Sequence, residues 1–225
     1  MIMILFILSL ISASLLLEDC RQVDQTFKIC RAEAHSLYEG GYILEGDYSQ
    51  LEFRVAGFLS KDPVIYEEVA SGFDVHSYTA SVMGVSRQDA KAHTFKPLYG
   101  GVLGTNREMA YYSAFRDKYK AVTEWHERLQ DEAVNTKKVV LPSGREYSFP
   151  YAKYTSRGTA VGATSIKNYP VQGFATADLL PLALIRLHKS LKAMIQPEAK
   201  SKIINTVHDS IVMDVHPDEK SQMVK

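Results

Sequence analysis

The sequence is poor in cysteine and has no excess of either charge. Its two cysteines, Cys20 and Cys30, lie ten residues apart and lack the Cys-x-x-Cys spacing that is typical of zinc sites and redox pairs. Two ordinary thiols in a reducing compartment are therefore expected. The 26 basic residues balance the 26 acidic ones, whereas nucleic-acid-binding domains are more often basic. Composition thus gives no support to a DNA partner and mildly opposes one.

Internal repeats and low-complexity tracts are also missing from the chain. Its 225 residues are enough to bury a core in one or two domains. The hydropathy pattern and the turn signals divide it into four segments. These are a hydrophobic leader at 1–36, a strand–turn–helix segment at 37–75, a mostly helical segment at 76–165 and a helix–hairpin segment at 166–225.

The residues around Asp47 are the most informative part of the chain. An apolar strand is predicted over 41–46, and Asp47 follows it at once. A helix comes next, with Leu51, Val55, Phe58 and Leu59 at the spacing of one buried face. A carboxylate at a strand end, beside a strand-to-helix turn, is a common place to hold a metal ion.

A second helix is predicted from Arg87 to about residue 100, with Ser86 as its N-cap. Arg87, Lys91, Phe95 and Tyr99 recur every fourth residue, so each step turns by about 40° and rises about 6 Å along the helix. Two cations followed by two aromatic rings suit an extended nucleoside triphosphate, with its phosphates near the positive helix N-terminus. An ordinary amphipathic face is the other interpretation of this stripe.

Two hairpins and one long helix complete the predicted elements. Alternating residues around a Pro-Ser-Gly turn predict a hairpin over 138–149, and a helix is predicted from about 173 to 194. A second hairpin pairs 202–207 with 210–215 across a His-Asp tip. Two of the predicted helices contain a proline. Pro97 is expected to disturb the last turn of the helix that begins at Arg87, and Pro181 is expected to kink the helix from about 173 to 194.

Five motifs along the chain resemble those of family A DNA polymerases, the family of bacterial DNA polymerase I and many phage enzymes. Residues 47–54 match motif A, D-Y-S-Q-(I/L)-E-(L/F)-R, and residues 87–100 fit every fixed position of motif B, R-x3-K-x3-F-x3-Y-G. Residues 74–80 resemble the D-(I/V)-H-x-x-T-A segment of the fingers. Residues 167–178 resemble N-x-P-V-Q-G-x-x-A-D, with one residue more between Gly173 and Ala177. Residues 208–210 resemble motif C, usually H-D-E. The resemblance covers roughly residues 39–216.

The resemblance implies a two-metal nucleotidyl transfer. Asp47 and Asp209 would be the catalytic carboxylates that hold two Mg²⁺ ions, about 3.5–4 Å apart in such sites, and the Tyr48 carbonyl would be an extra metal ligand. Adjacent antiparallel strands would bring the two aspartates together. Ser210 stands where motif C usually has glutamate, an auxiliary carboxylate. Weakened or altered metal handling is expected from this departure, rather than lost chemistry.

The resemblance also implies which residues contact substrates. Arg87, Lys91 and His76 would contact the triphosphate, Phe95 would stack on the nucleotide, and Glu52 would pair with Tyr99 to block a ribose 2′-OH. Phenylalanine rather than tyrosine at position 95 implies poor acceptance of dideoxynucleotides. The implied nucleotide-binding residues are Gln50, Glu52, His76, Arg87, Lys91, Phe95 and Tyr99. The implied DNA-binding residues are Asn168, Gln172 and His208.

The implied fold is α+β, a polymerase palm with an antiparallel sheet and a mostly helical fingers insertion. Residues 37–75 and 166–225 would form the palm, and residues 76–165 the fingers. Thumb and exonuclease domains have no counterpart in the chain, so it is expected to be a partial or split polymerase. The implied partners are primer-template DNA, dNTPs and a separate chain that carries the thumb and exonuclease domains. The expected location is the cytoplasm of a bacterial or phage-infected cell.

The first 17 residues contain no charged side chain, and three interpretations of them stay open. The first interpretation is a membrane anchor or a secretory signal. A membrane span needs about 20 apolar residues. A secretory signal normally begins with basic residues, whereas the first basic residue here is Arg21. A hydrophobic helix packed on a core is the second interpretation. The third, a reading-frame start that does not belong to the polymerase, is favoured because the resemblance begins only near Glu39.

Three alternatives to an active DNA polymerase remain. The chain could be an idle remnant or a structural subunit that binds nucleic acid or a partner chain. It could be a membrane-tethered protein that uses the leader. Single-subunit RNA polymerases share a related palm, but Glu52 as a 2′-OH gate argues against them.

Overall fold

The computed structural model describes residues 35–194 and 199–223. The interpretations of residues 1–17, and both cysteines, lie outside these residues. The described residues divide into two compact units, a helical unit of residues 50–174 and a sheet unit that combines residues 35–49 with 175–194 and 199–223. The described residues combine helices with small antiparallel sheets, which confirms the predicted α+β class.

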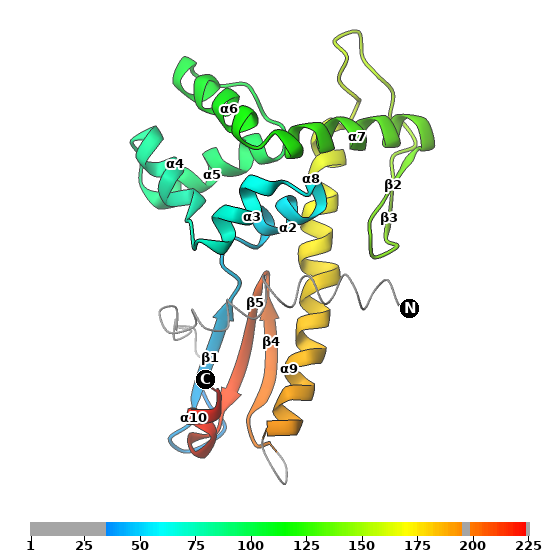
Figure 1. Ribbon diagram of the computed structural model, residues 1–225. Helices are drawn as coiled ribbons and strands as arrows, with labels where there is room; N and C mark the ends of the chain where they lie inside the picture. Colours follow the sequence, from blue (N-terminus) through cyan, green and yellow to red (C-terminus); the bar gives the residue numbers. More distant parts are fainter. Residues whose placement is uncertain (1–34, 195–198, 224–225) are drawn as a thin grey trace. The chain divides into compact units, whose positions relative to one another are not determined.

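The sheet unit is built on a three-stranded antiparallel sheet in the order β1-β5-β4 (Figure 1). Helix α9 packs on one face of it, where Leu187 and Leu191 contact Leu44, Met213 and Val215. The predicted hairpin forms with the expected bounds. The elements of this unit are β1 (Tyr42–Asp47), α9 (Leu180–Met194), β4 (Lys202–Val207), β5 (Ser210–Val215), the 3-10 turn η5 (Pro217–Glu219) and α10 (Lys220–Met223).

The register between β1 and β5 decides which side chains share the face away from α9. Tyr42 pairs with Val215 and Asp47 pairs with Ser210, without a shift along the strands. Because side chains alternate along a strand, Leu44 points toward α9 and Glu45 points to the opposite face. Asp47 and Ser210 share that opposite face with Glu45.

The helical unit contains seven α-helices and one short hairpin among its described residues. The hairpin pairs Val139 with Tyr147, as the Pro-Ser-Gly turn predicts. The elements are α2 (Leu51–Ser60), α3 (Pro63–Ala70), α4 (Val75–Met83), α5 (Arg87–Leu98), α6 (Asn106–Lys118), α7 (Lys120–Thr136), β2 (Lys138–Val140), β3 (Glu146–Ser148) and α8 (Ala163–Gly173).

Helix α2 is buried on more than the one face that the sequence predicts. Leu51 and Val55 are buried as predicted, but Phe58 and Leu59 are only half-buried. Phe53 is enclosed instead, with 1% of its surface exposed. The reason is that α2 packs against α3, α7 and α8, so neighbours lie on several of its sides.

The long helix near the C-terminus differs from its predicted form. It begins at Ala163 instead of about residue 173, and its α8 portion continues through Pro170. A π-helical segment, η4 (Phe174–Leu179), then precedes α9. Pro181 therefore falls in the first turn of α9, directly after the π-helical segment. A π turn re-routes backbone hydrogen bonds, and the kink expected at Pro181 stays a prediction.

In the described part of the chain, no helix is both long enough and apolar enough to cross a membrane.

Asp62 joins the starts of two helices in the helical unit. Its carboxylate accepts hydrogen bonds from the backbone N–H groups of Val64 and Ile65 in the first turn of α3, at 3.0 and 3.1 Å. It also accepts one from the Ala121 N–H at 3.1 Å, in the first turn of α7, whose own N-cap residue Tyr119 gives no side-chain cap. Asp62 is 1% exposed, so water does not replace it easily.

We expect Asp62→Ala to lower the free energy of unfolding of the helical unit by about 2 kcal/mol, because backbone donors at two helix starts lose their acceptor. Denaturant unfolding can be followed by the fluorescence of Trp125, the only tryptophan, which lies in α7. Asp117→Ala, at an exposed position of α6, is the matched control. Equal stability of the two variants would contradict this role of Asp62.

Candidate active site

The two predicted catalytic aspartates lie at neighbouring backbone positions in the sheet unit. Asp47 is the last residue of β1 and is exposed, and Asp209 lies in the two-residue turn between β4 and β5. The pairing of Asp47 with Ser210 sets the strands in place, and the Tyr48 N–H donates to the Asp209 carbonyl at 3.3 Å. The predicted approach of the two aspartates through adjacent antiparallel strands is confirmed. His208 takes the other turn position, with a positive φ of 57°.

The chemistry of this pair suits a hard divalent cation. Magnesium prefers carboxylate and carbonyl oxygens and keeps several of its waters, so one or two carboxylates are enough to hold it. Asp47 and Asp209 supply the carboxylates, and the backbone of Tyr48 lies beside them. Within residues 35–194 and 199–223, no group of three His, Cys, Asp or Glu side chains converges to hold a metal ion. The residues present therefore fit a site with two protein carboxylates that is completed by water or substrate.

Ser210, the departure from motif C, is not an isolated polar group. It is 4% exposed, and its Oγ lies 2.8 Å from Oε1 of Glu45 and 3.0 Å from the Val207 carbonyl. Both oxygens are acceptors, so the single hydroxyl proton is shared between them or alternates. A carboxylate from β1 thus contacts the position where the family usually has one from β5.

Helix α5 presents the predicted stripe on its accessible side. Arg87 is exposed, whereas Lys91, Phe95 and Tyr99 are half-buried. The Phe95 and Tyr99 rings stack, with centroids 6.2 Å apart and planes inclined by 16°. Ser86 caps the helix start, as predicted, by accepting from the Asp89 N–H. The side next to the stripe is closed by residues that are fully buried, namely Ala90, Thr94 and Leu98.

Pro97 disturbs α5 less than expected. The helix continues to Leu98, and the Tyr99 N–H still donates to the Phe95 carbonyl at 3.0 Å. The Gly100 and Gly101 N–H groups then close the end by donating to the carbonyls of residues 97 and 96. Tyr99 is therefore held at a well-defined helix end.

Glu52 links three parts of the helical unit. The Tyr99 hydroxyl donates to Glu52 Oε2 in a short hydrogen bond, which is the pairing predicted for these two residues. Gln172 Nε2, from α8, lies 3.5 Å from the other carboxylate oxygen. Burial and the adjacent Glu52 charge raise the pKa of Tyr99 far above its usual value, so the hydroxyl stays protonated and remains a donor at neutral pH.

Helix α8 places two of the predicted DNA-binding side chains one turn apart. Asn168 and Gln172 are four residues apart, so they share one side of the helix. Gln172 is exposed, while Oδ1 of Asn168 is buried and has no hydrogen-bond partner in the structure. Position 173, the next residue, requires glycine because a Cβ there would overlap the Tyr147 hydroxyl. The glycine thus lets the β2–β3 hairpin approach α8 closely.

His76 lies beneath the stripe and not on its surface. It is 4% exposed, its Nδ1 lies 3.2 Å from the Thr94 hydroxyl, and its ring packs edge-on against Phe95. Burial lowers the pKa of His76; the Asp74 charge opposes this, and the charges of Arg87 and Lys91 act with burial. His76 is therefore neutral at pH 7, so it can donate a hydrogen bond but adds no positive charge.

Arg87 is held by an ion pair with Asp74. Its Nε lies 2.7 Å from Oδ2 of Asp74, and Oδ1 of Asp74 caps α4 by accepting from the His76 and Ser77 N–H groups. Partial burial raises the pKa of Asp74, but hydrogen bonds from Arg87 and Ser77 outweigh it and lower the pKa to about 2. Asp74, the N-cap residue of α4, thus orients Arg87, the first cation of α5.

Gln50, predicted to bind nucleotide, makes contacts that its sequence position does not suggest. It adopts a positive φ of 54° at the start of α2. Its amide donates to the Phe73 carbonyl at 3.1 Å and accepts from the Val75 N–H at 3.0 Å. The side chain therefore braces the loop that carries Asp74, and its proposed contact with nucleotide stays a prediction.

One buried residue near the stripe was not anticipated from the sequence. His126 of α7 is 5% exposed and makes a hydrogen bond to the Leu98 carbonyl, at the end of α5. Burial lowers its pKa to about 3, with the Lys167 charge acting in the same direction, and its Nε2 has no partner. A neutral His126 thus fixes the helix end that carries Tyr99, and only tertiary packing reveals this.

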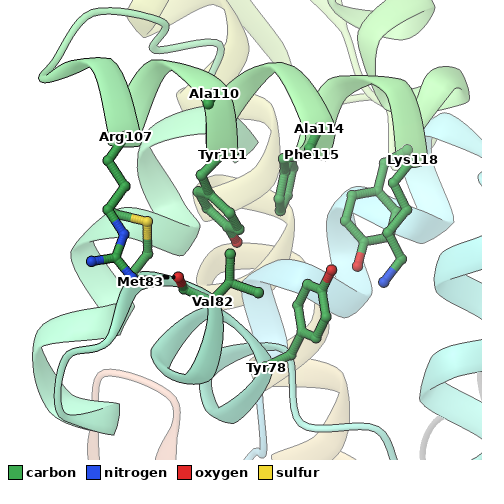
Figure 2. Close-up of a pocket in the computed structure, with 10 residues that line it drawn as sticks. Tyr78, Val82, Met83, Arg107, Ala110, Tyr111, Ala114, Phe115 and Lys118 are labelled. Atoms are coloured by element: carbon green, nitrogen blue, oxygen red, sulfur yellow. Dashed lines mark hydrogen bonds between the residues drawn. The ribbon is translucent and has the colours of Figure 1, made fainter.

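A pocket of about 290 Å³ lies between α4 and α6, away from these residues (Figure 2). Its walls are mostly apolar and aromatic, and Arg107 closes one end by donating to the Val82 carbonyl at 3.0 Å. None of the predicted site residues lines it. The lining residues are Tyr78, Val82, Met83, Arg107, Ala110, Tyr111, Ala114, Phe115, Lys118 and Tyr119.

We expect the pKa of Asp74 to rise from about 2 toward its ordinary value of 3.8 when Arg87 is changed to Gln. Because the folded-state pKa is lowered, the stabilisation is complete above about pH 4 and is lost as the pH falls toward 2. Carboxyl ¹³C NMR titration measures this pKa directly. Arg128→Gln, at an exposed position of α7, is the control. An unchanged Asp74 pKa in the Arg87 variant would refute the ion pair.

Comparison with known proteins agrees with the motifs. The family model described as DNA polymerase family A matches residues 28–225, so the similarity begins earlier than the expected Glu39. DNA polymerase I of Aquifex aeolicus is 31% identical over 214 residues, which cover 83% of this chain and 34% of the relative. DNA polymerase I of Lactococcus lactis (strain IL1403) is 33% identical over 203 residues, covering 80% of this chain and 22% of the relative.

Solved structures show the same fold. The POL domain of Pol1 from M. smegmatis, in complex with DNA primer-template and dNTP, superposes with a TM-score of 0.68. The two sequences are 24% identical, and the match covers 84% of this chain and 36% of that one. The chain thus spans about a quarter to a third of the length of the proteins it matches. With its motifs, its fold and a family match over residues 28–225, the chain belongs to DNA polymerase family A.

Proposed function

We propose that the chain carries out template-directed DNA synthesis, the transfer of a nucleotide from a dNTP to a primer 3′-OH. The observation that carries this proposal is the β1–β5 register, which sets Asp47 beside Asp209 in a chain of this family. Two-metal nucleotidyl transfer uses carboxylates that lie close together, and the pairing of Asp47 with Ser210, next to Asp209, supports such a site. Because the chain spans only part of its relatives' length, the activity is a proposal and not a consequence of membership.

The sheet unit supplies the metal ligands. Asp47 and Asp209 would hold two Mg²⁺ ions, with the Tyr48 carbonyl as a further ligand. When bound, such ions activate the attacking 3′-oxygen and stabilise the charge on the leaving pyrophosphate. Asp47 is exposed and Asp209 half-buried, so both carboxylates are accessible to a hydrated cation and to a phosphate.

The helical unit supplies the contacts with the triphosphate. Arg87 lies in the first turn of α5 and Lys91 one turn later, where the helix dipole also favours an anion. The positive charge must come from these two side chains, since the lowered pKa of His76 keeps that residue neutral. His76 would then contribute a hydrogen bond through an imidazole N–H. The ion pair with Asp74 would orient the Arg87 side chain toward a bound phosphate.

The later part of α5 would select the nucleotide. Phe95 would stack on the incoming base, and Tyr99 would lie at the template side of the new pair. Glu52 would exclude a ribose 2′-OH, because its carboxylate is already committed to the Tyr99 hydroxyl. The half-buried setting of this hydrogen bond makes its loss costly.

Duplex contacts would come from both units. Gln172 is exposed on α8, and together with Asn168 it would contact the minor groove, whose acceptors are nearly the same for all base pairs. Such contacts check the shape of a pair without reading sequence. His208 in the β4–β5 turn would contact the backbone of the primer end. Residues 37–75 and 166–225 would form the palm, and residues 76–165 the fingers.

We expect Asp47→Asn and Asp209→Asn each to reduce nucleotide incorporation by about 10³-fold, since loss of a metal ligand removes several kcal/mol of transition-state stabilisation. Incorporation on a primed template is measured with and without a thumb-bearing fragment of a relative, because this chain spans part of the relatives' length. Asp218→Asn, an exposed carboxylate in the same unit, is the control.

Circular dichroism must show that both aspartate variants remain folded. Wild-type activity in either variant would refute the metal assignment. A wild-type chain that is inactive under every condition, yet binds primed DNA, would favour the alternative of an inactive remnant that serves as a binding subunit. Ser210 in motif C is the observation that keeps this alternative open.

We expect Glu52→Ala to reduce the preference for dATP over ATP, measured as the ratio of their kcat/KM values, by about 10²-fold or more. The physical reason is that alanine removes both the steric block and the Tyr99 acceptor. Glu67→Ala, at an exposed position of α3, is the matched control. An unchanged ratio in the Glu52 variant would show that another group selects the sugar.

A further inference from the structure

We propose that Glu45, on β1, replaces the auxiliary carboxylate that family A motif C carries at the position of Ser210. This inference rests on the proposed function, because it adds one residue to the same metal-binding face. Glu45 stands two residues before Asp47 and belongs to none of the motifs that identify the family. Its role follows from a contact across the sheet and not from its sequence context.

The strand register brings the three side chains together. Asp47 is paired with Ser210, and Glu45 is paired with Val212. Glu45 and Ser210 are therefore diagonal neighbours on one face of the sheet, within reach of a long side chain. Residues two apart on a strand lie about 7 Å apart, so the Glu45 backbone is one such step from that of Asp47.

The hydrogen bond between Ser210 and Glu45 explains why serine suits position 210. Ser210 Oγ lies 2.8 Å from Glu45 Oε1, and the serine is buried while Glu45 is half-buried. A glutamate at position 210 would place a second carboxylate against Glu45, and like charges at neighbouring cross-strand positions repel. Serine offers a donor instead. Glu45 and Ser210 thus form a matched pair in which the carboxylate has moved from β5 to β1.

An auxiliary role requires charge near the metal and not direct ligation. Asp47 and Asp209 remain the protein ligands, which agrees with the lack of a three-residue metal cluster over the described ranges. Glu45 contributes a negative charge on the same face of the sheet. At the dielectric constant of water, a unit charge at a separation of about 7 Å would change the affinity of a divalent cation by up to about tenfold.

Manganese binding to the full 225-residue chain, followed by the EPR signal of free Mn²⁺ in the absence of nucleotide and DNA, tests the proposal without an activity readout. We expect Glu45→Gln to weaken Mn²⁺ binding about tenfold. We expect Ser210→Ala to change it less than twofold, because the Glu45 charge remains. The exchanged variant Glu45→Ser with Ser210→Glu should recover most of the wild-type affinity, since the carboxylate returns to β5.

The variants separate this proposal from a structural role of Glu45. If Glu45 only oriented Ser210, Glu45→Gln and Ser210→Ala would have equal effects and the exchanged variant would not recover, which would overturn the proposal. Wild-type affinity in Glu45→Gln would overturn it as well. Glu39→Gln, an exposed carboxylate in the same unit, is the matched control, and thermal melting confirms that each variant is folded.

Asp47→Asn distinguishes failure of this inference from failure of the proposed function. If Asp47→Asn weakens Mn²⁺ binding and Glu45→Gln does not, the inference about Glu45 fails while the metal site stands. If Mn²⁺ binding is insensitive to Asp47→Asn as well, both fail. In the incorporation assay, the Mg²⁺ concentration for half-maximal rate should rise about tenfold in Glu45→Gln and stay near the wild-type value in Ser210→Ala.

Discussion

The antiparallel pairing of β1 with β5 is the constraint on which the site of the sheet unit depends. Its register places Asp47 opposite Ser210 and so beside Asp209. The same register sends Leu44 to the core under α9 and Glu45 to the polar face. A slip of one residue would exchange the two faces, burying the carboxylates and exposing the core. Burial of apolar side chains on the face toward α9 therefore holds Asp47 and Ser210 on the opposite face.

The helical unit is arranged around ionisable groups whose charge states are set by their neighbours. Asp74 remains ionised because Arg87 and Ser77 donate to it, and Tyr99 remains protonated because it is buried beside Glu52. His76 is kept neutral by burial. At pH 7 the α5 stripe therefore begins with the cations Arg87 and Lys91 and ends with Tyr99, whose protonated hydroxyl donates to Glu52.

Much of this arrangement can be predicted from the sequence, because alternating strands, a hairpin tip and the spacing of four on α5 are local patterns. The approach of Asp47 to Asp209 also follows, once the two strands are taken as neighbours. The Glu45–Ser210 contact could have been found by extending that pairing two residues. By contrast, Gln50 and His126 act through backbone groups far away in the sequence, and only the packed fold brings those groups to them.

The central claim is that Asp47 and Asp209 bind divalent metal ions together. Anomalous diffraction from crystals of the chain soaked with Mn²⁺ and a dNTP tests it most directly, because manganese can be located without reference to activity. The claim predicts an anomalous peak bonded to carboxylate oxygens of both aspartates at the β4–β5 turn. Anomalous manganese peaks at other positions, with no peak at these two carboxylates, would contradict the claim.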